Sequence, residues 1–169
     1  RLQPGEHLLV LGATGSTGLA AVQLGKLLGA TVIAAGRSPA KLEVVQAHGA
    51  DHVLRCDDGE GAPTMREQLK ALTGGRGVDV VYDPVGGSLS EAALRGIAWQ
   101  GRFLVVGFAS GEIPKIPLNL TLLKGCQIVG VFWGSFAMRE PAANRAHSVQ
   151  LFQWINEGRL SPAIDEVFP

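Results

Sequence analysis

A glycine-rich turn near the amino terminus carries the clearest chemical signal in this sequence. It follows the apolar run 7–11, precedes a stretch of helical length, and reads Gly12, Ala13, Thr14, Gly15, Ser16, Thr17, Gly18. In a dinucleotide-binding turn, the first small residue allows a tight bend, the second admits the pyrophosphate, and the third lets the helix pack closely. Ala13, Gly15 and Gly18 take these positions, and the helix start offers N–H groups to phosphates. We expect residues 13–18 to bind a dinucleotide in a crevice opened by Gly12, Gly15 and Gly18. The alternative is a tight turn without a ligand.

The end of the next apolar run discriminates between the two pyridine dinucleotides. An acidic residue about 20 positions beyond the motif would bind the ribose of NAD. Gly36 stands there instead, followed by Arg37, Ser38 and, one turn on, Lys41. Guanidinium, hydroxyl and ammonium groups attract a 2′-phosphate, which a carboxylate would repel. We therefore expect NADPH as the cofactor. The alternative is that Arg37 and Lys41 are ordinary solvated charges.

The rest of the chain predicts the scaffold that positions these segments. Short apolar runs alternate with helical stretches, which indicates right-handed βαβ units and a sheet covered on both faces. The expected fold is α/β, a Rossmann fold with a doubly wound parallel sheet of about six strands. Strands are expected at 7–11, 31–35, 52–54, 78–82, 102–106 and 127–132. Helices are expected at 17–28, 39–48, 64–72, 88–97 and 141–156, with a polar loop at 57–63. Ser38 is expected to cap one helix, and Thr64 with Glu67 to form a capping box on another.

Composition excludes several classes of function. The 169 residues carry 15 basic and 15 acidic side chains, whereas nucleic-acid-binding proteins usually show a basic excess. No run reaches membrane-spanning length and no signal peptide opens the chain, so a cytoplasmic location is expected, with the mitochondrial matrix left open. Cys56 and Cys126 are expected to be free thiols. The four histidines lack metal-ligand spacing, and no catalytic triad or carboxylate pair stands out, so we assign neither metal ligands nor catalytic residues.

Four longer segments then form a specific pattern, at 12–24, 77–87, 101–111 and 123–134. They resemble the coenzyme-binding domain of the medium-chain dehydrogenase/reductase superfamily, in its zinc-independent quinone oxidoreductase branch, the ζ-crystallin-like proteins. The resemblance covers essentially the whole chain, and Ser16 departs from a glycine common in that branch. Because the chain starts at Arg1 and residues 165–169 could begin another strand, we interpret residues 1–169 as one NADP-binding domain of a longer parent, without its catalytic domain.

The resemblance implies positions for the nicotinamide half of the coenzyme. Val85 and Gly86 would border the nicotinamide ribose. The nicotinamide face would be lined by Gly107, Phe108 and Ala109. The carboxamide would meet backbone groups of Phe132, Trp133 and Gly134. Alternative interpretations are that Asp83 caps the turn after its strand and that the two aromatic residues at 132 and 133 belong to the core.

The resemblance also implies a function. NADPH would pass hydride to a quinone or an α,β-unsaturated carbonyl, in a cleft between this domain and a separate catalytic domain. The sixth strand would pair with its two-fold mate in a homodimer, while this fragment alone would bind NADPH with little or no turnover. Three alternatives stay open: a zinc-type alcohol dehydrogenase parent, an enoyl reductase acting on a thioester, and a non-enzymatic NADPH sensor.

Overall fold

A computed structural model describes residues 2–56 and 64–164 of the chain. They divide into two compact units, one extending to Gly130 and the other beginning at Val131. The loop expected at 57–63 and the strand start expected at 165–169 lie outside the described residues. All strands of the described ranges belong to the first unit.

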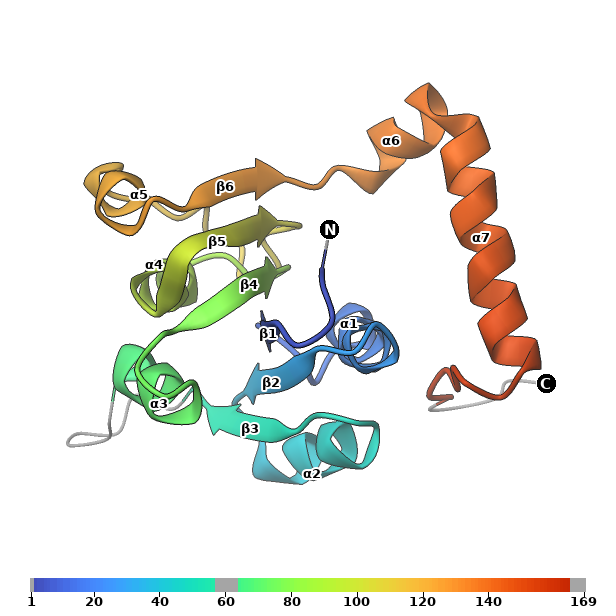
Figure 1. Ribbon diagram of the computed structural model, residues 1–169, viewed down its shortest axis with the longest axis horizontal. Coiled ribbons are helices and arrows are strands. Elements are labelled where there is room, and N and C mark those ends of the chain that lie inside the picture. Colours follow the sequence, from blue (N-terminus) through green and yellow to red (C-terminus); the bar gives the residue numbers. More distant parts are fainter. Residues whose placement is uncertain (1, 57–63, 165–169) are drawn as a thin grey trace. The chain divides into compact units, whose positions relative to one another are not determined.

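The first unit is built on one six-stranded parallel sheet in the order β3-β2-β1-β4-β5-β6 (Figure 1). Its strands are β1 (His7–Val10), β2 (Thr31–Gly36), β3 (His52–Arg55), β4 (Val78–Asp83), β5 (Ile97–Val105) and β6 (Gln127–Gly130). The strand order reverses direction between β1 and β4, and ligands of such sheets bind beyond the carboxyl ends of the strands at that point. The predicted Rossmann fold is confirmed.

Helices of the first unit cover both faces of this sheet. Those of the first unit are α1 (Ser16–Leu27), α2 (Pro39–Ala47), α3 (Met65–Leu72), α4 (Ser88–Arg95) and α5 (Asn119–Lys124). Those of the second unit are α6 (Trp133–Arg139) and α7 (Pro141–Asn156). The predicted caps form: the Ser38 hydroxyl accepts from the backbone N–H of Lys41, and Thr64 and Glu67 make a reciprocal capping box. No helix within the described ranges is both long and apolar enough to cross a membrane.

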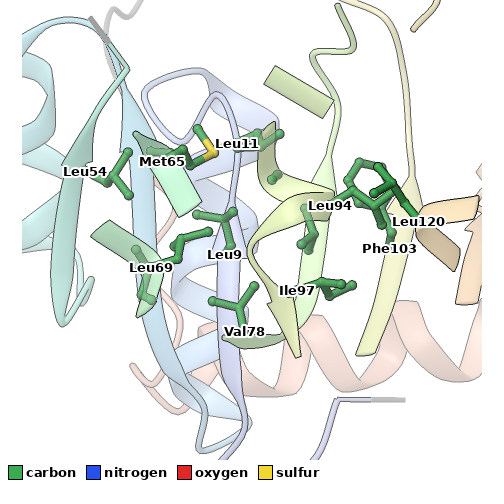
Figure 2. Close-up of a cluster of buried hydrophobic side chains, with 14 residues drawn as sticks. Leu9, Leu11, Leu54, Met65, Leu69, Val78, Leu94, Ile97, Phe103 and Leu120 are labelled. Atoms are coloured by element: carbon green, nitrogen blue, oxygen red, sulfur yellow. The ribbon is translucent and has the colours of Figure 1, made fainter. Parts of the chain in front are cut away.

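Alternating residues of the strands supply two apolar clusters, one on each face of the sheet. Leu9 and Leu11 pack with side chains of α3, α4 and α5, whereas Leu8 and Val10 pack with α1 and α2. Figure 2 shows the first cluster, in which Leu69 of α3 and Leu94 of α4 meet the central strands. Burial on both faces explains why these strands appear as continuous apolar runs in the sequence.

Charged side chains tie together the amino edge of the sheet. Asp79 of β4 accepts from the backbone N–H of His7 at 2.8 Å and pairs with Arg76 at 2.9 Å. Asp51, just before β3, accepts from the Val32 N–H at 2.7 Å and pairs with Lys26 at 2.7 Å. A further pair joins Glu6, before β1, to Arg102 of β5 at 2.5 Å. Each network links segments that lie far apart in the sequence.

Several predicted boundaries were wrong. The helix expected to run to Ile97 ends at Arg95, and β5 begins at Ile97 rather than at Arg102. Ile97 pairs with Val78, after which a register shift and the left-handed Gln100 (φ 60°) interrupt the apolar pattern. The sixth strand ends at Gly130 rather than at Phe132. Helices α5 and α6 were not predicted, because each is too short to show a clear apolar period.

Candidate functional site

A crevice of about 740 Å³ opens at the carboxyl edge of the sheet in the first unit. It collects residues that follow β1, β2, β3, β4 and β5, which is where the parallel topology predicts a ligand. Ten residues predicted to bind the coenzyme line it: Thr14, Gly15, Ser16, Thr17, Gly18, Gly36, Arg37, Val85, Gly86 and Ala109. The predicted pyrophosphate, 2′-phosphate and nicotinamide-ribose segments therefore converge on one cavity.

The glycine turn brings the start of α1 against the end of β1. Gly12 has a φ of 59°, which an L side chain rarely adopts, and a Cβ atom there would lie 2.6 Å from Val85 Cγ2. A Cβ atom on the buried Gly18 would overlap the carbonyl of Gly12 and lie 2.7 Å from the Cα of Ala13. Only glycine at position 18 allows this close helix–strand approach. Ala13 is itself buried and donates its N–H to Ala35 O at 3.0 Å, so it shapes the turn without lining the crevice.

The first turn of α1 is available to an anion. Gly15 is the N-cap, and among the described residues no side chain caps this helix and no acidic residue occupies its first turn. The exposed residues Gly15, Ser16 and Thr17 form this part of the crevice wall. Helix N-termini with unsatisfied N–H groups bind phosphates through these donors and the helix dipole. A Cβ atom on Gly15 would meet nothing nearer than Gly12 O at 3.6 Å, so the free fold does not require glycine there.

The end of β2 provides a cation. Arg37 is exposed, lines the crevice and makes no hydrogen bond or ion pair with the rest of the described chain. Gly36 is packed tightly, since a Cβ atom there would lie 2.9 Å from Thr14 Cγ2 and 3.2 Å from Leu42 Cδ2. Ser38 and Lys41 do not line the crevice, and the Ser38 hydroxyl caps α2. Arg37 is thus the best-placed partner for a phosphate at this end.

The opposite end of the crevice is formed by two loops that hold each other. Ala109 donates its backbone N–H to Pro84 O at 3.0 Å, and Ser110 donates to Val85 O at 2.9 Å. Gly107 and Phe108 do not line the crevice, but the Phe108 ring lies against Gly86, where a Cβ atom would approach its Cδ1 atom to 2.9 Å. Phe108 therefore contacts the wall at Gly86, and Gly107 lies close to Pro84, since a Cβ atom there would be 3.3 Å from Pro84 O.

The three remaining predicted residues belong to the second unit. Phe132 precedes α6 and Trp133 and Gly134 begin it, with the indole Nε1 of Trp133 donating to Asn144 Oδ1 at 3.3 Å. Phe132 and Trp133 are exposed, so the alternative that they are core residues is not supported. Their contact with the carboxamide stays a prediction.

Several crevice residues were not singled out in the sequence: Ala35, Cys56, Pro84, Gly87, Ser88, Leu89, Ser110 and Glu112. Cys56 directly follows β3, so the rule that strand ends converge could have found it. Glu112 had no local signal, because only tertiary structure brings its carbonyl to the Gly87 N–H, at 3.1 Å.

The crevice has few ionisable side chains. Of the described residues that line it, Arg37 and Glu112 alone carry a charge at neutral pH. Tyr82 of β4 does not line the crevice, and burial raises the pKa of its phenol above the ordinary value. Across residues 2–56 and 64–164, no group of three or more His, Cys, Asp or Glu side chains could hold a metal ion. The site can bind and orient a phosphate-bearing ligand but offers little acid–base chemistry of its own.

Comparison with known proteins places this geometry among dehydrogenases. The family model described as zinc-binding dehydrogenase matches residues 16–148. Quinone oxidoreductase-like protein 2 of Bos taurus is 41% identical over 168 residues, which are 98% of this chain and 47% of that protein. The chain thus spans about half the length of this curated relative.

Solved structures agree. The Escherichia coli quinone oxidoreductase complexed with NADPH is 28% identical with a TM-score of 0.83, covering 97% of this chain and 49% of that one. The CurK enoyl reductase is 27% identical with a TM-score of 0.81, covering 99% of this chain and 48% of that one.

Proposed function

The chain belongs to the zinc-binding dehydrogenase family, within the medium-chain dehydrogenase/reductase superfamily, and from this premise we propose that it selects NADPH for a quinone reductase-like enzyme. In general terms, the chain is the NAD(P)-binding domain of a quinone oxidoreductase-like protein. The proposed electron acceptor is a quinone or an α,β-unsaturated carbonyl compound, bound in the longer parent protein.

One observation carries this proposal: a helix start and an arginine, Arg37, line the same crevice, and neither has a side-chain partner among the described residues. We assign the pyrophosphate to the N–H groups around Gly15, Ser16 and Thr17. The 2′-phosphate is assigned to Arg37, and the nicotinamide ribose to the wall formed by Val85. Bound NADPH would supply hydride from its nicotinamide ring, and the protein would bind and orient it. Such a role requires few titratable side chains, and few of the described residues that line the crevice are ionisable.

Two related enzymes are alternatives. The likeness to the CurK enoyl reductase favours an acceptor that is an unsaturated thioester, which uses the same coenzyme half. A zinc-dependent alcohol dehydrogenase is the other alternative, because the zinc ligands of that group would lie mainly in the catalytic domain of the parent. The segments 107–111 and 132–134 resemble the zinc-independent branch and favour it over this alternative.

Coenzyme choice is the direct test. We expect the chain to bind NADPH about 10- to 150-fold more tightly than NADH, because one hydrogen bond to a charged group contributes roughly 1.5–3 kcal/mol. Calorimetric titration of both coenzymes measures this ratio, which Arg37→Ile should remove and salt should weaken. Arg66→Gln is the control, because this exposed arginine of α3 does not line the crevice. Equal affinity of the unaltered chain for both coenzymes would refute the NADPH assignment.

A double substitution probes the same end of the crevice. Gly36→Asp combined with Arg37→Ile would supply a ribose acceptor for NADH while removing the phosphate partner. A Cβ atom at position 36 would press on the side chains of Thr14 and Leu42, so these side chains must shift, and Thr14 lines the crevice. We therefore expect Gly36→Asp to weaken the binding of both coenzymes. Arg37→Ile as a single substitution should weaken the binding of NADPH.

We propose a homodimer formed through β6. This strand lies at the sheet edge, all four of its residues are exposed, and its side chains carry no charge. The loop around Pro114 and Pro117 leaves it uncovered in the described structure, and uncharged edges of this kind pair readily with another strand. Sedimentation at micromolar concentration should show a dimer that Val129→Lys converts to monomer. A monomer before and after the substitution would contradict the proposal.

Turnover separates an enzyme from a sensor. We expect this chain to bind NADPH but to oxidise it with a simple quinone far more slowly than an enzyme with a kcat of about 1 s⁻¹. The full-length parent should reach such a rate. A parent that binds NADPH yet reduces neither quinones nor unsaturated thioesters would favour the non-enzymatic sensor.

A further inference from the structure

Asp83 ends β4 with a carboxylate that is almost fully buried, with 3% of the residue exposed. Its Oδ1 atom accepts from the backbone N–H groups of Val85 and Gly86, at 2.8 and 2.9 Å. Its Oδ2 atom accepts from the hydroxyl of Ser90 in α4, at 2.5 Å. No basic side chain of the described residues pairs with it. A buried charge is costly unless it is hydrogen-bonded, so these three donors must offset its desolvation.

These hydrogen bonds fix a turn of unusual backbone geometry. Gly86 and Gly87 have φ values of 74° and 64°, in the left-handed region that favours glycine. The turn is also packed tightly, since a Cβ atom on Gly86 would lie 2.8 Å from Glu112 O. The Asp83 carbonyl accepts from the N–H of Val106 at 2.9 Å, which connects the same residue to the end of β5. One aspartate therefore holds both loops at this end of the crevice.

The other end has its own hydrogen bonds. The glycine turn is held by Gly15 N–H to Gly12 O at 3.1 Å and by Ala13 N–H to Ala35 O at 3.0 Å. The carboxylate of Asp83 takes part in neither. A change at Asp83 should thus disturb one half of the crevice more than the other.

We propose that Asp83, together with Ser90, is a positioning residue for the nicotinamide half of the coenzyme. This inference rests on the proposed coenzyme site. The carboxylate touches no part of the ligand; it sets the 84–87 turn so that Val85 and Gly86 form a wall for the ribose. A loosened turn would leave the phosphate end intact and lose the orientation of the nicotinamide.

The test compares two ligands. NADPH spans the whole crevice, whereas adenosine 2′,5′-bisphosphate has the adenine, the 2′-phosphate and one further phosphate but no nicotinamide half. We expect Asp83→Ala to weaken NADPH about tenfold or more, the effect of losing hydrogen bonds to a charged group, and to leave the bisphosphate within about twofold. Asp83→Asn should restore most of the NADPH affinity, because its amide oxygen still accepts from both N–H groups and its NH₂ can donate to Ser90.

Thr73→Val is the matched control. Thr73 is a buried polar residue near the opposite end of β4, where its hydroxyl donates to Leu69 O at 2.7 Å and accepts from Gly77 N–H at 2.8 Å. Its loss should lower stability without changing the ratio of the two affinities. If Asp83→Ala does not fold, Ser90→Ala is the second variant, because it removes one donor to the carboxylate. It should weaken NADPH binding about threefold relative to binding of the bisphosphate.

Equal losses for both ligands, or an unchanged ratio in the Asp83 and Ser90 variants, would overturn the inference while the coenzyme site stands. An unaltered chain that binds neither ligand would overturn the proposed function as well.

Discussion

The two edges of the same sheet are held together by different chemistry. At the amino edge, carboxylates and basic side chains join segments through Asp79 with Arg76, Asp51 with Lys26 and Glu6 with Arg102. At the carboxyl edge, backbone hydrogen bonds, glycine contacts and the single carboxylate of Asp83 fix the loops. The charged side chains of the amino edge therefore have partners of opposite charge within the fold. At the carboxyl edge, where we propose that the coenzyme binds, the N–H groups at the start of α1 and the Arg37 side chain have no side-chain partner among the described residues.

This difference predicts that substitutions at the two edges separate stability from binding. Changes at the amino edge should lower stability and leave coenzyme affinity alone. Changes at the carboxyl edge should affect binding, and stability only where the fold itself needs the residue.

The largest effect is expected for Gly18→Val. Its side chain would overlap the backbone of Gly12 and Ala13, and overpacking of this kind costs about 1–3 kcal/mol or more of unfolding free energy. Urea unfolding should show the loss, and NADPH binding should disappear. Gly15→Ala is the partner variant, because its Cβ atom has room in the free fold but faces the proposed pyrophosphate. It should keep the stability and lose affinity; equal behaviour of the two variants would contradict the close-packing argument.

A smaller effect is expected at the amino edge, for Asp51→Asn. Burial raises the pKa of Asp51, but the hydrogen bonds from Lys26 and Val32 outweigh this and lower the pKa below its ordinary 3.8. The stabilisation is therefore complete above the unfolded pKa and is lost as the pH falls through the lower folded pKa. We expect the substitution to cost about 1 kcal/mol at pH 7, because the pair is partly exposed, and NADPH affinity to stay unchanged. Unfolding curves from pH 2 to 7 should converge for the two proteins at the acid end; parallel curves would show that the charge of Asp51 is irrelevant.

The smallest effect is expected for Glu91→Gln. Glu91 pairs with Arg95 at 2.6 Å across one turn of α4 and belongs to none of the three amino-edge ion pairs. Exposed pairs of this spacing contribute about 0.3–0.5 kcal/mol. The midpoint of thermal unfolding should barely change, and the change should be smaller still at high salt. A loss as large as that of Asp51→Asn would mean that the amino-edge networks have no special role.

The sequence predicted the fold and most of the crevice because both depend on local patterns. Buried parallel strands appear as apolar runs, and the capping box of Thr64 and Glu67 is visible as a spacing of three residues. The predicted cap by Asp83 is confirmed as well, although its full set of partners is not local, since Ser90 comes from the next helix.

What the sequence could not predict depends on tertiary contact. The start of β5 at Ile97 follows from pairing with Val78, which no local pattern displays. Glu112 enters the crevice through a hydrogen bond to Gly87, 25 residues earlier in the chain. The tight space around Gly36 comes from Thr14 and Leu42, so a residue that the sequence assigned to the coenzyme site also has a packing role.

The uncapped start of α1 has a consequence for how long the protein survives. Any ligand that binds only the folded chain raises its unfolding free energy, by about 2.7 kcal/mol at a concentration of 100 times Kd. If NADPH is the group that satisfies these N–H donors, the folded fraction follows the supply of reduced coenzyme. Degradation would then draw on the ligand-free chain, and the amount of protein would fall when reducing equivalents run short, without any dedicated regulatory site.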